Sequence, residues 1–103
     1  MTVAGAQQET WNEAPPSRTL EIVNRKGLHA RASAKFVETV GRFEAGVLVE
    51  KDDEEVSGDD LLGLLMLAGT KGSTITVSAA GPDAVATLDA IEALVASGFE
   101  EDD

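Results

Sequence analysis

Two hydrophobic periods alternate along the chain, and their order constrains the fold more than any other feature of the sequence. Three segments alternate apolar and polar residues and are predicted to be half-buried strands: 19–23, 47–50 and 73–79. The polar stretch 51–54 has the composition of a hairpin turn, so residues 54–57 are predicted to form a fourth, short strand.

Three other segments repeat their apolar residues at the helical period, and we predict helices over 30–40, 59–67 and 83–96. Gly41 and Gly98 are well placed to end the first and third helices, and Pro82 suits the first turn of the third. Their predicted core stripes are Ala30, Ser33, Ala34, Val37 and Val40 in the first helix and Val85, Leu88, Ile91, Leu94 and Val95 in the third.

The order βαββαβα predicts an α+β fold, in which a four-stranded antiparallel sheet carries three helices on one face. The polar Thr74, Thr76 and Ser78 indicate that the other face of the sheet is in contact with water. We expect one domain over residues 18–98. Residues 1–17 are predicted to be a flexible N-terminal tail that includes Trp11, and residues 99–103 a short acidic tail that keeps the protein soluble.

Composition excludes several classes of function. The net charge of −11 disfavours binding to nucleic acids, which are polyanions. The chain has no cysteine, so it cannot form a disulfide or a thiolate metal site, and we predict neither a metal nor a cofactor. No apolar run is long enough to span a membrane, and the N-terminal segment lacks the pattern of a secretion signal. We therefore expect a cytoplasmic protein without membrane contact, and a monomer.

The candidate site lies where the first strand leads into the first helix. Six of the eight basic residues fall between positions 18 and 42, so this acidic chain has a local positive region. The chain's one histidine, His29, stands at the predicted start of the helix, where unpaired amides such as that of Ala30 and the helix dipole favour a phosphate. Gly27 gives the turn conformational freedom, and Arg31 adds a cationic contact. A neutral imidazole is a competent nucleophile.

The segment 27–31, Gly-Leu-His-Ala-Arg, followed by Ala-Ser-Ala-Lys-Phe-Val, resembles the active-site segment of HPr, the histidine-containing phosphocarrier of the bacterial phosphotransferase system, and of its nitrogen-branch relative NPr. The resemblance covers about residues 18–98 and implies the open-faced β-sandwich fold of that family. It also implies that the protein is a phosphocarrier rather than an enzyme. His29 would accept a phosphoryl group on Nδ1 from enzyme I or its nitrogen-branch equivalent and pass it to an enzyme IIA-type acceptor, while Arg31 would steady the phosphate.

The same resemblance implies that the second helix docks these partners, and we assign Leu61, Leu62 and Leu65 to that surface. Two positions depart from the family pattern. Ala32 replaces the usual proline after the arginine, and alanine preserves the helix. Asp60 stands where many relatives have a serine that a kinase phosphorylates, and it either mimics a phosphoserine or stabilises the helix N-terminus, of which we favour the second.

A competing hypothesis is a regulatory binding module of the nitrogen branch that acts through the leucine-rich second helix, with no sugar transport and without phosphorylation of His29. Hydrolase chemistry lacks support, since no second histidine, cysteine or pair of buried carboxylates accompanies His29.

Overall fold

A computed structural model of the protein describes residues 14–101, in which four strands and three helices alternate along the chain. The elements are β1 (Ser17–Glu21), α2 (Ala30–Val40), β2 (Gly46–Lys51), β3 (Glu54–Ser57), α3 (Leu61–Met66), β4 (Thr74–Ala80) and α4 (Ala84–Ala96). This is the predicted βαββαβα order, and the α+β fold with an open-faced sheet is confirmed.

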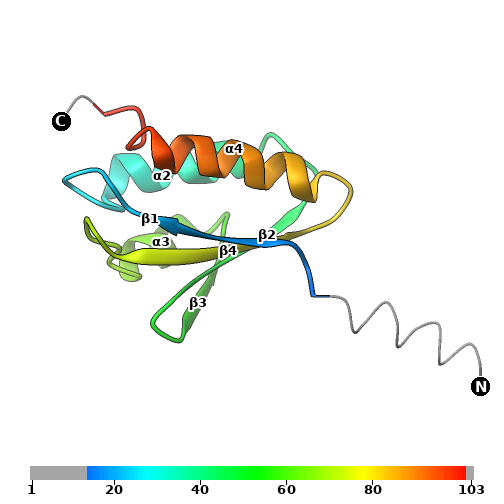
Figure 1. Ribbon diagram of the computed structural model, residues 1–103, viewed down its shortest axis with the longest axis horizontal. Coiled ribbons are helices and arrows are strands. Elements are labelled where there is room, and N and C mark those ends of the chain that lie inside the picture. Colours follow the sequence, from blue (N-terminus) through cyan, green and yellow to red (C-terminus); the bar gives the residue numbers. More distant parts are fainter. Residues whose placement is uncertain (1–13, 102–103) are drawn as a thin grey trace, which may run out of the picture.

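The four strands form one antiparallel sheet in the order β1-β4-β2-β3. Figure 1 shows α2 and α4 lying across one face of this sheet, and the hairpin of β2 and β3 extending away from them. The hairpin turns through Asp52 and Asp53, which both adopt left-handed backbone conformations. Aspartate tolerates this conformation better than most residues, which explains the acidic turn.

The core lies between the sheet and the helices, because each central strand points alternate apolar side chains at α2 and α4. Leu20 of β1 pairs with Ile75 of β4, and Val77 of β4 pairs with Val49 of β2. The largest fully buried apolar side chains of the core are Phe36, Phe99, Ile22, Leu64, Ile75, Leu88, Ile91, Val49, Val77 and Val95. α3 contacts α2 and β3 and adds Leu64 to this core.

Several element boundaries differ from those predicted. β1 begins and ends two residues earlier, because Ser17 already pairs with Ser78, and Ile22, though buried, lies beyond the strand. The second helix is shorter than predicted. It starts after Asp60, whose side chain accepts a hydrogen bond from the amide of Gly63 at 3.0 Å and so caps the first turn.

The predicted core stripe of α2 is confirmed at Ser33 and Val40 but is wrong at Ala30 and Ala34. The helix buries Ala32, Ser33, Phe36, Thr39 and Val40, whereas Ala30 and Ala34 are not buried and Val37 is only half-buried. Phe36 is the largest apolar side chain of this helix, and its burial sets the face. In α4 the predicted core residue Val85 is exposed, and Ala84 and Thr87 take its place in the interior.

Both predicted tails meet the folded part of the chain. The carbonyl of Pro16 accepts a hydrogen bond from the amide of Ala79, and Ser17 lies in β1. Phe99, which the sequence places in the acidic tail, is fully buried in the core. Trp11 and the rest of residues 1–13 lie outside the described residues, as do residues 102–103. Between residues 14 and 101, no helix has the length and apolarity that crossing a membrane requires.

Candidate functional site

His29 is the N-cap residue of α2. Its backbone is extended and its carbonyl accepts the first helical hydrogen bond, from the amide of Ser33 at 2.8 Å. Its ring nitrogen Nδ1 accepts a hydrogen bond from the amide of Arg31 at 3.3 Å. The side chain is one quarter exposed, so a partner protein can reach the ring. The imidazole therefore caps the N-terminus of the helix, a role usually taken by serine or aspartate, and it remains accessible.

The loop before His29 depends on two residues. Gly27 has a φ of +65°, and any Cβ at this position would lie 2.1 Å from the carbonyl oxygen of Gly69, so no other residue fits. Leu28 donates its amide hydrogen bond to the same carbonyl, which ties the loop to the segment that follows α3. The buried Asn24 donates from Nδ2 to the carbonyl of Gly27 at 2.9 Å and closes the turn. These contacts fix where His29 stands.

The start of α2 leaves donors available near the ring. In the described part of the chain, no acceptor pairs with the amides of Ala30 and Ala32, as expected for the first turn of a helix. The guanidinium of Arg31 is exposed and has no hydrogen-bond or ion-pair partner among residues 14–101. Amide donors and the helix dipole thus lie at the end of the helix where His29 is found, and Arg31 belongs to the same first turn, which is a suitable environment for a phosphoryl group.

A carboxylate from the far end of the chain completes the site. The Glu101 side chain forms a hydrogen bond with Nε2 of His29 and accepts a second one from Nδ2 of Asn24 at 3.1 Å. This side chain is only 9% exposed. Burial opposes its ionisation, but the hydrogen bonds from His29 and Asn24 outweigh burial and lower the pKa of Glu101 below its ordinary value of 4.5.

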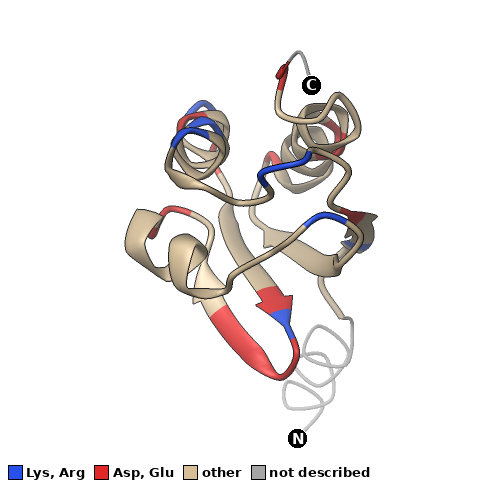
Figure 2. Ribbon diagram, turned by 90° about the vertical axis from the view of Figure 1, so that its left-hand side faces the viewer, with Lys and Arg blue, Asp and Glu red and all other residues tan. Residues whose placement is uncertain are grey.

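Basic residues gather around this end of the molecule. Figure 2 shows lysine and arginine on α2 and on loops near it, whereas the charged residues of the hairpin of β2 and β3 are mostly acidic. Lys35 of α2 donates to the carbonyl of Phe99 at 2.8 Å, so one of these cations also holds the C-terminal segment. The local positive region expected from the sequence is thus present despite the net charge of −11.

The leucines of α3 divide between the core and the surface. Leu64 and Leu67 are buried, whereas Leu62 is 66% exposed and Leu61 is also exposed. Leu65 is half-buried. Met66, 72% exposed, extends the apolar surface. We refer to Leu61, Leu62, Leu65 and Met66 as the α3 patch. The hydrogen bond between Leu28 and Gly69 joins the loop after α3 to the loop of His29.

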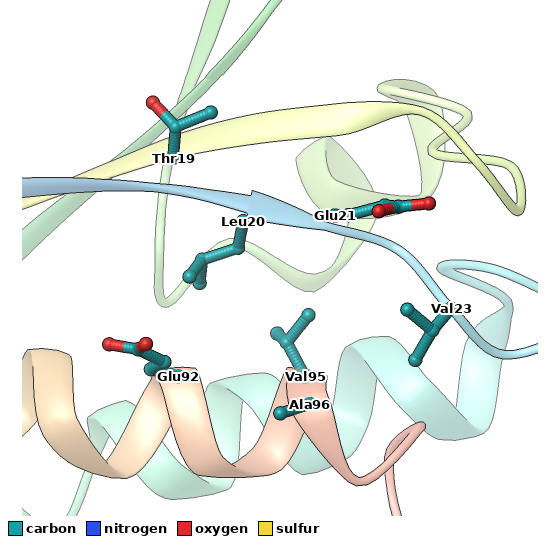
Figure 3. Close-up of a pocket in the computed structure, with 7 residues that line it drawn as sticks. All are labelled: Thr19, Leu20, Glu21, Val23, Glu92, Val95 and Ala96. Atoms are coloured by element: carbon teal, nitrogen blue, oxygen red, sulfur yellow. The ribbon is translucent and has the colours of Figure 1, made fainter.

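Two surface hollows among the described residues do not include His29. One is formed between β1 and α4, and Figure 3 shows apolar side chains facing one another across it, with two carboxylates at its edge. Its lining residues are Thr19, Leu20, Glu21, Val23, Glu92, Val95 and Ala96. None of them is a nucleophile of the kind His29 offers. Among the described residues, no group of three or more His, Asp or Glu side chains could hold a metal ion.

Sequence reasoning identifies His29, Arg31, Gly27 and Ala30, and the structure brings all four together at one helix end. It misses Glu101, which it places in a solubilising tail. Glu101 lies 72 residues from His29 along the chain, so no local spacing could connect the two. It also gives no role to Asn24, although an asparagine three residues before a turn glycine is a usable signal for a side chain that closes a turn.

Comparisons with known proteins show the family of this chain. Residues 16–97 match the model of the PTS-HPr family, described as the PTS HPr component phosphorylation site. The chain is 40% identical over 84 residues to the phosphocarrier protein HPr of Neisseria meningitidis (serogroup A), covering 82% of this chain and 94% of the relative. It is 42% identical over 86 residues to the phosphocarrier protein NPr of Escherichia coli K12, covering 82% and 96%.

Solved structures give the same result for the fold. HPr from Thermoanaerobacter tengcongensis superimposes with a TM-score of 0.81 at 36% identity and covers 84% of this chain and 98% of its own. HPr from Bacillus anthracis superimposes with a TM-score of 0.77 at 35% identity, covering 81% and 99%.

Proposed function

Because the chain belongs to the HPr family of phosphocarrier proteins of the phosphotransferase system, we propose that His29 is its phosphorylation site. The protein accepts a phosphoryl group from an enzyme I-type donor and passes it to an enzyme IIA-type acceptor. In this role it is a monomer in the cytoplasm that meets its two partners in turn, and it is a carrier, not a turnover enzyme.

The observation that carries this proposal is the orientation of the His29 ring. Nε2 is covered by Glu101, whereas Nδ1 faces the first turn of α2 through the amide of Arg31. A phosphoryl group on Nδ1 would therefore lie beside the amides and the dipole of the helix, and within the field of the Arg31 guanidinium.

The transfer step needs only these groups. The lone pair of Nδ1 attacks the phosphorus, a P–N bond forms on His29, and the bond from phosphorus to the donor atom breaks with its electron pair returning to the donor. Passing the group to the acceptor repeats the same exchange, with His29 as the leaving group. The protein contributes position and charge, which are the main requirements of phosphoryl transfer.

The α3 patch supports the partner part of the proposal. An exposed cluster of leucine and methionine on a short helix suits a surface that binds several proteins in turn, because methionine and leucine side chains adapt to different contacts. This patch would also serve the competing function, a regulatory module that binds partners without phosphorylation of His29.

Incubation with phosphoenolpyruvate and the enzyme I-type protein from the same genome, followed by intact mass measurement, separates the two functions. The carrier gains one phosphoryl group, and the variant His29→Gln gains none. Absence of a mass increase in the wild type, with a donor that phosphorylates its own HPr or NPr, would exclude the carrier function. A mass increase that persists in His29→Gln would place the phosphoryl group on another residue.

A further inference from the structure

The chain makes an unusual turn after α4. Gly98, Phe99 and Glu100 have φ values of 71°, 57° and 62°, so three consecutive residues adopt the left-handed conformation. Glycine does so without strain, but Phe99 and Glu100 each carry a steric cost. Such a conformation persists only where the surroundings enforce it, and strained backbone of this kind is concentrated at functional sites.

Two contacts enforce the turn. The Phe99 side chain is fully buried in the core, and the Phe99 carbonyl accepts a hydrogen bond from Nζ of Lys35 at 2.8 Å. Lys35 lies in α2, between one and two helical turns after His29, so the helix that carries the histidine also holds the turn. Glu100 itself is exposed, at 3.8 Å from the same Lys35.

The result of the turn is the placement of one carboxylate. Glu101 contacts Nε2 of His29 through one oxygen and Nδ2 of Asn24 through the other. Asn24 is buried, and its second bond, to the carbonyl of Gly27, fixes its amide group as the donor in both contacts. Three segments of the chain thus meet at one side chain.

These contacts specify the tautomer of His29. An ionised carboxylate can only accept, so the proton of the hydrogen bond with Glu101 is carried by Nε2. On the opposite side of the ring Nδ1 accepts from the Arg31 amide, so Nδ1 carries no proton. Both contacts select the neutral ring with its lone pair on Nδ1, the nitrogen that faces the helix amides.

We propose that Glu101 is a positioning residue for phosphoryl transfer, which holds His29 in the Nε2–H tautomer and offsets the positive charge that the ring gains when Nδ1 is phosphorylated. This inference rests on the proposed function. During the attack Nδ1 gives its lone pair to phosphorus while the proton stays on Nε2, so the phosphorylated ring becomes cationic. A carboxylate against Nε2–H stabilises this cation, as a buried aspartate does for the imidazolium of a hydrolase triad.

The test compares Glu101→Gln with Glu100→Gln. Both variants lose one negative charge from the same turn, but only the first loses it beside His29. Each is mixed with phosphorylated donor in single-turnover experiments, and ring ¹⁵N shifts of His29 are recorded by NMR. We expect Glu101→Gln to slow phosphorylation by ~10-fold or more, by analogy with metal-bound histidines that lose the hydrogen-bond partner of their other ring nitrogen. We also expect it to shift the ring nitrogens towards a mixture of tautomers. Glu100→Gln should match the wild type in both measurements.

Glu101→Asp supplies the rescue experiment, because it keeps the charge and shortens the side chain by one methylene; we expect it to recover part of the rate. A Glu101→Gln variant that is phosphorylated as fast as the wild type, or faster because the carboxylate merely blocks the ring, would overturn this inference. So would wild-type ring shifts that report a proton on Nδ1. Failure of the wild type to accept any phosphoryl group would instead refute the proposed function.

Discussion

Leu62 and Leu64 form a matched pair for testing the division of α3 into a core face and a docking face. They lie two residues apart in one six-residue helix, and one is 66% exposed while the other is fully buried. Replacement by alanine removes the same atoms at both positions and leaves helix propensity almost unchanged. Any difference in stability therefore reports burial alone.

The structure sets the expected sizes of the two effects. Leu64→Ala opens a cavity between α3 and the sheet, and such substitutions cost ~2–5 kcal/mol. Full burial of a leucine side chain contributes ~1.5–3 kcal/mol. Because Leu62 is 66% exposed, only about a third of that contribution is present, and Leu62→Ala should cost about 1 kcal/mol or less. In a domain of this size, 1 kcal/mol corresponds to roughly 4–8 °C in Tm.

Urea unfolding followed by circular dichroism measures both variants. Leu64→Ala should lower the midpoint with an unchanged slope, whereas Leu62→Ala should stay close to the wild type. Binding to the enzyme I-type donor should depend on the exposed leucine instead. We expect Leu62→Asp to weaken this binding while the domain stays folded. Equal loss of stability in the two alanine variants, or unfolding of Leu62→Asp, would refute the assignment of Leu62 to the surface.

Three further predictions concern the site and the cap of α3. Gly27→Ala should destabilise the domain by more than ~1 kcal/mol in urea unfolding, because its Cβ would collide with the carbonyl of Gly69 and its φ is positive; full stability would refute the close approach. Asp60→Ala should cost ~0.5–2 kcal/mol through loss of the bond to the Gly63 amide, and Asp60→Ser should restore most of it; an equal loss in both would contradict the capping role. Because the pKa of Glu101 is lowered on folding, its contribution to stability is complete above pH 4.5 and is lost as the pH falls through its folded-state pKa. The Tm should therefore depend less on pH between pH 7 and pH 3 in Glu101→Gln than in the wild type. An unchanged dependence of Tm on pH would argue against the contact between Glu101 and His29.

Much of the fold could be predicted from hydrophobic period and turn residues, because both signals are local. The bounds of α2 agree with the prediction, since His29 and Gly41 flank a segment of good helix formers. The core face of that helix could not be derived from spacing alone, because Ala30 and Ala34 repeat at the helical period as well as Ala32 and Phe36 do. Only packing against the sheet and α4 decides between the two faces.

Some residues of the site could likewise be predicted from local sequence, whereas others depend on the tertiary structure. His29 and Arg31 belong to one short segment, so the pattern of a helix start rich in basic residues is enough to predict that they lie close together. Glu101 reaches His29 only because Phe99 is anchored in the core and the backbone reverses at three successive left-handed residues. Composition alone presents residues 100–103 as surface charge, and this interpretation overlooks a carboxylate that contacts the imidazole.

We propose that Nδ1 of His29 carries the phosphoryl group beside the amides of α2. NMR of the phosphorylated, ¹⁵N-labelled protein tests it directly, since coupling between ³¹P and a ring nitrogen identifies the bonded atom. We expect coupling to Nδ1 of His29, with the proton retained on Nε2. Coupling to Nε2, the nitrogen that Glu101 covers, or phosphate on any other side chain would contradict it.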